Sequence, residues 1–221
     1  APETKDTDFT WKEFQARNNN ELVAIFGNFI NRVLVLTHKY YEGSVPSPKA
    51  FSEIDTETLE KVNAFPASLS KSIERYRFRE ASQELMNLAR LGNKYLADEE
   101  PWKLIKTDPQ RVQTIMYVAL QVSAALAIVS EPFLPSTSQK LKTMLQLPTH
   151  SWEAVEKGAT LLEPAHQIGT ATLLFAKIED AEIEHQLEKL AQSKLANTLS
   201  NKVVEPQKET VSFEDFSKLD I

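Results

Sequence analysis

Apolar residues recur every three or four positions over most of this chain, which is the spacing of one face of an α-helix. The first long run extends from Glu21 to Tyr40 and ends before Gly43 and Pro46. Only five glycines occur among 221 residues, fewer than a sheet protein with many tight turns needs. The pattern therefore predicts an all-α fold, a helical bundle.

Further helices follow from the same spacing and from the prolines that interrupt it. We expect one at about 56–76, with Asp55 or Thr56 as N-cap and a kink or break at Pro66, and another at 77–96. Small residues in the second, Gly92 among them, would allow close packing on a neighbouring helix.

Pro101 ends that pattern and predicts a short new helix over 101–106, with Trp102 near its start. Asp108 followed by Pro109 is a strong helix start, and the apolar run then continues to Ser130. A shorter amphipathic helix precedes Pro148. Residues 151–178 indicate turns with a brief extended stretch, and 179–199 returns to helix.

The composition limits the classes of function. The chain has no cysteine, so it has neither disulfides nor a thiolate metal site, and we expect a cytoplasmic protein. The most apolar run, 115–129, is shorter than a membrane span and is interrupted by Gln121, so no membrane contact is expected. A net charge of -6 argues against non-specific binding of DNA or RNA through a broad basic surface.

Catalytic and metal-binding patterns are absent from the sequence. The four histidines, His38, His150, His166 and His185, are far apart, none forms an i, i+4 pair with another histidine, and no cysteine is present to complete a metal site. The neighbouring carboxylates at 99–100 and 179–180 do not face each other on a helix, so we interpret them as solvated charges. We expect no catalytic residue, no metal and no cofactor in this chain.

Four residues form a candidate binding site. Asn28 and Arg32 lie four positions apart, hence on one helix face, and together can read the edges of unpaired bases. Trp102, held by the rigid Pro101, could offer a flat ring to a base. Taken alone, each has a commoner explanation: Asn28 and Arg32 as ordinary polar surface residues, Trp102 as a core residue.

Two sequence blocks favour the binding interpretation. Residues 20–33, NELVAIFGNFINRV, closely resemble the start of the anticodon-binding domain of methionyl-tRNA synthetases, and 93–102, NKYLADEEPW, are similar to that family's segment ending in Pro-Trp. Residues 174–179 resemble the segment before the family's last helix, and 211–221 resemble the start of an appended tRNA-binding OB domain. The resemblance covers nearly the whole chain.

The resemblance implies a division of the chain and a role for each site residue. Residues 1–18 would be an entry segment from a missing catalytic module, and residues 19–178 would form the anticodon-binding bundle of the class I synthetase type. Residues 179–203 would form a C-terminal helix, and residues 204–221 would form a linker and the start of the OB domain. Trp102 would stack on the first base of the CAU anticodon, Asn28 and Arg32 would hydrogen-bond base edges, and Pro101 would shape the platform.

The resemblance also implies properties of the parent enzyme. The parent would ligate methionine to tRNA using ATP, with zinc in its catalytic module, and would dimerise, if at all, through the missing OB domain. This chain alone would be inactive. One departure concerns the last helix: Ala176 and Lys177 stand where the family often has Pro-Arg, which leaves the docking of that helix open. The alternative is a non-catalytic helical protein-interaction module.

Overall fold

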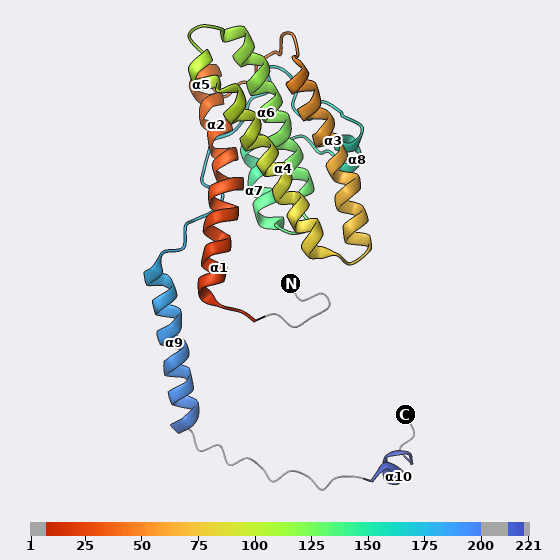
Figure 1. Cartoon of the computed structure of the whole chain (residues 1–221), viewed down its shortest axis with the longest axis vertical. Helices are drawn as coiled ribbons and strands as arrows, with labels where there is room; N and C mark the ends of the chain where they lie inside the picture. Colours follow the sequence, from red (N-terminus) through yellow and green to blue (C-terminus); the bar gives the residue numbers. More distant parts are fainter. Residues whose placement is uncertain (1–7, 200–211, 219–221) are drawn as a thin grey trace. The chain divides into compact units, whose positions relative to one another are not determined.

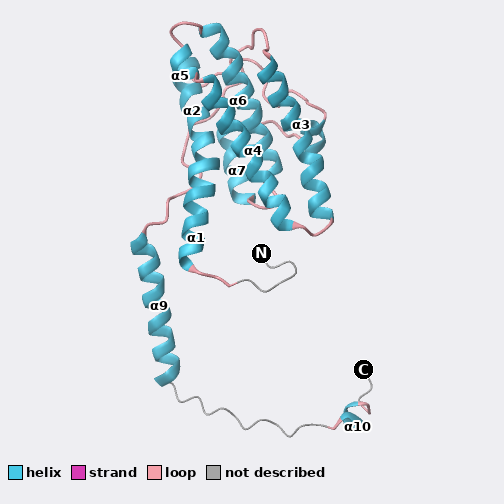
Figure 2. Cartoon of the chain, in the orientation of Figure 1, coloured by secondary structure: helices cyan, strands magenta, loops and turns pink. Residues whose placement is uncertain are grey.

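The protein is described by a computed structural model that covers residues 8–199 and 212–218 (Figure 1). Within these ranges the secondary structure is helical, and the only pairing of extended backbone is an isolated bridge between Ser44 and Gln167 (Figure 2). The all-α prediction is confirmed. The chain divides into two compact units, Ala1–Glu179 and Asp180–Ile221.

The first unit is built around α6 (Pro109–Val129), which is buried continuously from Thr114 to Val129. It packs against α2, α3, α4, α5, α7 and α8. With a mean hydropathy of 1.8, α6 is long and apolar enough to cross a membrane, but 94% of its most apolar window is covered by the protein itself, so it is a core helix. Its predicted start is confirmed: the Asp108 side chain accepts a hydrogen bond from the Arg111 N–H at 2.9 Å.

Helices α3 (Glu53–Glu74) and α4 (Phe78–Glu99) form an antiparallel pair against α6. Helix α3 begins earlier than predicted because Ser52, and not Asp55 or Thr56, is its N-cap, and the helix continues through Pro66 without a break. The close approach expected of Gly92 is confirmed, since a Cβ at this position would overlap the Phe29 ring.

The first helical run also begins earlier than the predicted Glu21. Helix α1 (Trp11–Arg17) starts at Thr10, whose hydroxyl accepts the Glu13 N–H at 3.1 Å, and leads into a π-helical stretch, η1 (Asn18–Gly27), and then α2 (Asn28–Tyr41). π-Helical turns are rare, so the pattern gave no reason to expect one. The run ends at Glu42, which adopts a left-handed φ of 54°.

The remaining helices of the first unit are α5 (Pro101–Leu104), α7 (Pro135–Leu145) and α8 (Trp152–Glu156). The short helix after Pro101 is confirmed, whereas α8 corrects the prediction of turns over 151–178, because Ser151 caps a short helix there. In the second unit, α9 (Asp180–Leu199) is the expected last helix and α10 (Phe213–Phe216) is a single turn. Residues 200–203 of the predicted last helix lie outside the described residues, as does most of 204–221.

Candidate functional site

The corner between α4 and α5 fixes the position of Trp102. Glu100 has a left-handed φ of 41°, which ends α4, and Pro101 occupies the first position of α5, where a proline is favoured. The Lys103 N–H then donates to the Glu100 carbonyl at 2.8 Å. Pro101 is buried, and the half-buried Trp102 packs against the edge of the core. One side of the indole is therefore supported by the bundle.

Arg32 covers the Trp102 ring. Its guanidinium carbon lies 4.6 Å from the ring centroid, a cation-π contact between α2 and α5. Contacts of this kind are worth about 0.5–1 kcal/mol at exposed sites and about 2 when desolvated. Arg32 and Trp102, which are far apart in the sequence, are thus brought together as the candidate site requires.

Asn28 lies one helical turn before Arg32, as the first residue of α2, and it is exposed. Its amide oxygen and nitrogen face solvent on the helix that carries Arg32. Of the four candidate residues, the structure places Arg32, Trp102 and Pro101 at one corner of the bundle. Asn28 lies next to that corner, one turn before Arg32 on α2.

An ionic network around the buried Asp55, with Arg111 and Glu99 partly buried, supports this corner from within the bundle. The Arg111 guanidinium donates to both oxygens of Asp55, at 2.8 Å to Oδ1, and to Glu99 Oε2 at 2.7 and 3.0 Å. The Tyr95 hydroxyl donates to Asp55 Oδ1 at 2.5 Å, and the Ser52 N–H donates to Oδ2 at 2.8 Å. One cation therefore joins α3, α4 and α6 beside the turn that leads to Trp102.

The network determines the protonation of its members. Burial disfavours the charged form of Asp55, but hydrogen bonds from Arg111, Tyr95 and Ser52 outweigh it and lower the pKa of this carboxyl. Burial, together with the hydrogen bond to Asp55, raises the pKa of Tyr95, and the hydrogen bond to Asp55 raises that of Arg111. Asp55 is accordingly ionised and Tyr95 neutral at neutral pH.

Sequence reasoning did not identify these residues as supports of the site. Part of the signal was present, because Ser52-x-x-Asp55 has the spacing of a capping box, with Asp in place of Glu. A second support is Asn93, whose amide donates to the Ile25 carbonyl at 2.8 Å and joins α4 to η1. Neither the pairing with Arg111 nor this link can be read from a single sequence.

The histidines hydrogen-bond backbone carbonyls in three of the four cases. His38 Nε2 lies 2.9 Å from Gly169 O, His150 Nε2 3.0 Å from Leu161 O, and His166 Nε2 2.8 Å from Leu145 O. Each joins a helix or loop to the 161–169 segment, which gives these rings structural roles. Within residues 8–199 and 212–218, no group of three or more metal-ligating side chains is found.

Comparison with protein families gives two matches, which follow one another along the chain with residues 35–44 between them. A family model described as the anticodon binding domain of methionyl tRNA ligase matches residues 45–195. A second, described as tRNA synthetases class I (M), matches residues 1–34. Together they cover η1, the α4–α5 corner and the whole of α6.

Curated relatives agree with both matches. A methionine–tRNA ligase of Christiangramia forsetii is 64% identical over this whole chain, and one of Flavobacterium psychrophilum is 61% identical. The chain spans about a third of their length, 33% and 32%.

Solved structures confirm the fold. The apo form of Mycobacterium tuberculosis methionyl-tRNA synthetase superposes with a TM-score of 0.72 at 22% identity, covering 77% of this chain and 35% of that one. The fold, the family match and the relatives lead to one conclusion. The chain belongs to the family of anticodon-binding domains of methionyl-tRNA ligases.

Proposed function

We propose that this chain binds methionine tRNA and reads its CAU anticodon with Trp102, Arg32, Asn28 and Pro101. The observation that carries the proposal is the convergence of Arg32 on the Trp102 ring at 4.6 Å, at a corner held by a partly buried ionic network. Single-stranded RNA is recognised by stacking of splayed bases on aromatic rings and by hydrogen bonds to their edges. The corner offers both kinds of group.

In the proposed mechanism, the first anticodon base stacks on the indole of Trp102. The core packs against one part of the ring and the Arg32 guanidinium covers another, so an arriving base takes the place of Arg32. The guanidinium, once displaced, presents its planar set of donors to the edge of that base or its neighbour. Pro101 contributes by fixing the backbone from which the ring projects.

Asn28 supplies the second polar group of the proposed site. Its exposed amide carries a donor and an acceptor one turn from Arg32 and suits the edge of a second base. A good bidentate contact to a base discriminates by about 1–3 kcal/mol. Because so few residues are required, a chain with a net charge of -6 is compatible with specific RNA binding.

The test is a titration of the 221-residue chain with anticodon stem-loops, CAU against a variant of the first base, at a stated salt concentration. We expect tighter binding of CAU. Trp102→Ala should weaken it by about 5- to 150-fold, the equivalent of ~1–3 kcal/mol for one stacked base. Trp102→Phe, which keeps a ring, should recover part of that loss. Equal affinity for both stem-loops would refute the proposal.

The same experiment separates the alternative, a helical protein-interaction module, which the relatives do not favour. In that case Trp102 acts only as a packing residue, and Trp102→Ala lowers stability without changing RNA binding. The ring is half-buried, so some loss of stability is expected under either interpretation. Binding is therefore measured well below the midpoint of thermal unfolding, with Leu173→Ala, an exposed apolar position, as the matched control.

For the parent protein we propose the activity of its relatives, ATP-dependent ligation of methionine to tRNA in the cytoplasm. The division of the chain at residues 18, 178 and 203, the zinc of the catalytic module and a dimer formed through an OB domain remain parts of this proposal. The chain itself should be inactive. Formation of methionyl-adenylate from methionine and ATP by the purified chain would contradict this.

A further inference from the structure

The solvent-facing side of α2 carries an apolar side chain beside the polar ones of the proposed site. Asn28, Arg32 and Val35 follow one another at steps of four and three residues, which places them on one side of the helix. Val35 is 46% exposed, whereas Val33 and Leu34, which precede it, are 0% and 1% exposed. Every other valine among the described residues is buried or half-buried. Val35 therefore differs from the other valines in facing solvent, and it does so next to two residues of the site.

The folding of the helix gives no reason for a valine at this position. A β-branched side chain loses rotamer freedom in a helix, so valine is a poorer helix former than Ala, Leu, Lys or Arg. At Val33 this cost is offset by packing in the core, but Val35 lies outside the core cluster. Single exposed apolar residues are ordinary, so exposure alone indicates nothing. The position of Val35 beside Arg32 is what points to function, because local rules are broken most often at functional sites.

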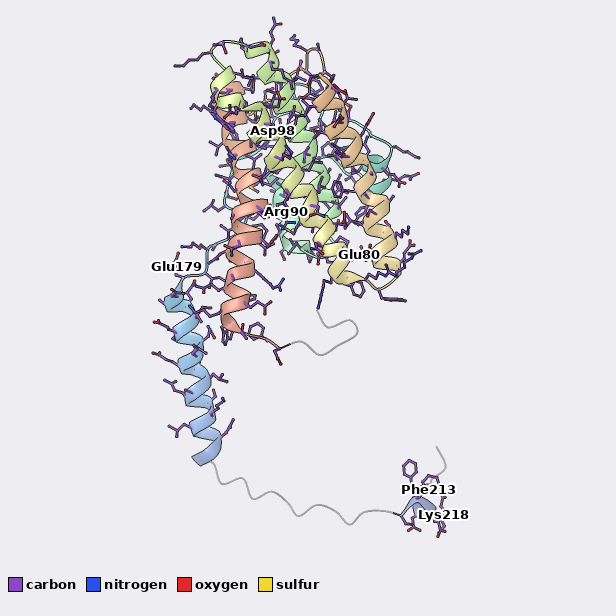
Figure 3. All side chains as sticks on the ribbon, viewed as in Figure 1. Glu80, Arg90, Asp98, Glu179, Phe213 and Lys218 are labelled. Carbon is purple, nitrogen blue, oxygen red and sulfur yellow. The ribbon has the colours of Figure 1, made fainter. Side chains whose placement is uncertain are left out.

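Val35 lies at the end of the bundle that carries Trp102. Arg32 covers the indole ring at 4.6 Å, so α2 and α5 are in contact there. Figure 3 marks Asp98 in the last turn of α4, at this end of the bundle, and Glu80 at the opposite end. Along the axis of α2, Val35 lies three residues, or about 4.5 Å, beyond Arg32. The isopropyl group is thus about one turn away from the residue that contacts the proposed stacking ring.

We propose that Val35 is a further specificity-determining residue of the RNA site, an apolar contact for the face of the second anticodon base, adenine. The inference rests on the proposed function, in which the first base stacks on Trp102. Stacked bases repeat at about 3.4 Å along a strand, which is close to the step of about 4.5 Å from Arg32 to Val35. The nucleotide that follows the first base is therefore within reach of Val35.

Adenine suits the two side chains that remain on this side of α2. A purine has a larger apolar face than a pyrimidine, so it removes more of the isopropyl group from water. Asn28 has the amide that pairs with adenine in a bidentate manner, through one donor and one acceptor. Val35 would accordingly favour a purine over a pyrimidine, and Asn28 would distinguish adenine from guanine.

The test is a titration of the 221-residue chain with CAU anticodon stem-loops at a stated salt concentration. Val35→Ala removes most of the isopropyl group and should weaken binding by about three- to tenfold. Val35→Thr keeps the shape and a similar helix propensity but replaces a methyl group with a hydroxyl, so it should also weaken binding, by about threefold. Neither variant changes a charge, so the dependence of affinity on salt should equal that of the wild type. Leu173→Ala, at an apolar residue that is 69% exposed, is the control and should bind like the wild type.

An abasic nucleotide at the second anticodon position identifies the base that Val35 contacts. Without that base, wild type and Val35→Ala should bind the stem-loop equally, because the variant has no contact left to lose. An abasic first position should leave the effect of about three- to tenfold in place. If the effect of Val35→Ala disappears at the first or third position instead, the contact belongs to another base and the proposal is overturned.

Thermal unfolding separates an RNA contact from a packing role. Alanine is the better helix former, so Val35→Ala should leave the unfolding midpoint at or above that of the wild type while the affinity for RNA falls. A lower midpoint with unchanged affinity would identify a packing residue and overturn the proposal. The proposed function fails by a different result, equal affinity for CAU and its first-base variant. A clear preference for CAU combined with wild-type affinity of both Val35 variants would refute only the role of Val35.

Discussion

Replacing Arg111 by Met tests whether the ionic network stabilises the bundle next to the α4–α5 corner that carries Trp102. Asp55 is fully buried, and Arg111 is the cation that neutralises it. Removing one partner of a buried ion pair costs about 3–5 kcal/mol, because a charge is left without compensation. Tyr95 and Ser52 still donate to Asp55, so we expect a loss near the lower end, about 3 kcal/mol.

The assay is urea unfolding of the wild type and the variant. The free energy of unfolding is calculated from the urea concentration at the midpoint and from the slope of that free energy against urea concentration. Lys61→Met is the control, since it removes one cation from an exposed pair with Glu57 and should cost no more than about 0.5 kcal/mol. The double variant, Arg111→Met with Asp55→Asn, should lose less free energy of unfolding than the two single variants lose together. The difference should be about 0.5–3 kcal/mol.

The pH dependence of the same variant has a definite sign. In the wild type the pKa of Asp55 is lower in the folded state than in the unfolded state, where it is about 4. The ionised Asp55 therefore stabilises the folded protein above about pH 4, and this stabilisation is lost as the pH falls through the pKa of the folded state. Without Arg111, burial dominates and favours the neutral carboxyl. The stabilities of wild type and Arg111→Met should therefore converge as the pH is lowered toward 4 and below. A loss under about 1 kcal/mol at neutral pH, or a gap that widens in acid, would refute this account of the network.

Two further predictions concern packing and a buried hydroxyl. Gly92→Ala should destabilise the bundle by about 1–3 kcal/mol, because the added methyl group overlaps Phe29, and a thermal unfolding midpoint no lower than that of the wild type would contradict this. Burial, with a smaller contribution from Tyr40, raises the pKa of Tyr41 to about 12. The wild type should therefore lose stability as the pH rises from about 10, the value of an unfolded tyrosine, toward 12, and Tyr41→Phe should lose less, as measured by urea unfolding across that range.

Features set by neighbours in the sequence were predicted well. The Asp108-Pro109 start of α6 and the Pro101 start of α5 depend on local chemistry, on a side-chain acceptor and a fixed φ. The close approach at Gly92 was predicted from its missing Cβ, although its partner, Phe29, is distant in the sequence. Where a local signal was present but misjudged, the error was small, as with Ser52 in place of Asp55 as the cap of α3.

Features set by distant contacts were missed. The π-helical stretch η1 is accompanied by hydrogen bonds from the Asn18 and Asn19 side chains to the carbonyls of Ala176 and Ile178, a segment about 160 residues further along the chain. The apolar pattern begins at Glu21 and contains no sign of these contacts. The same holds for Arg111, whose partners lie on two other helices.

The candidate site combines both kinds of feature. Pro101 and Glu100 set the direction of Trp102 locally, whereas the contact with Arg32 exists only once α2 and α5 meet through the bundle. A short peptide with the Pro-Trp sequence would therefore carry the ring without its cation. Arg111 on α6 pairs with Asp55 on α3 and with Glu99 at the end of α4. These ion pairs fix the position of the α4–α5 corner relative to α6. The proposed reading of a base at Trp102 consequently requires the folded core as well as the four residues of the site. If the proposal is correct, changes at the partly buried Arg111 should weaken RNA binding without any contact with RNA.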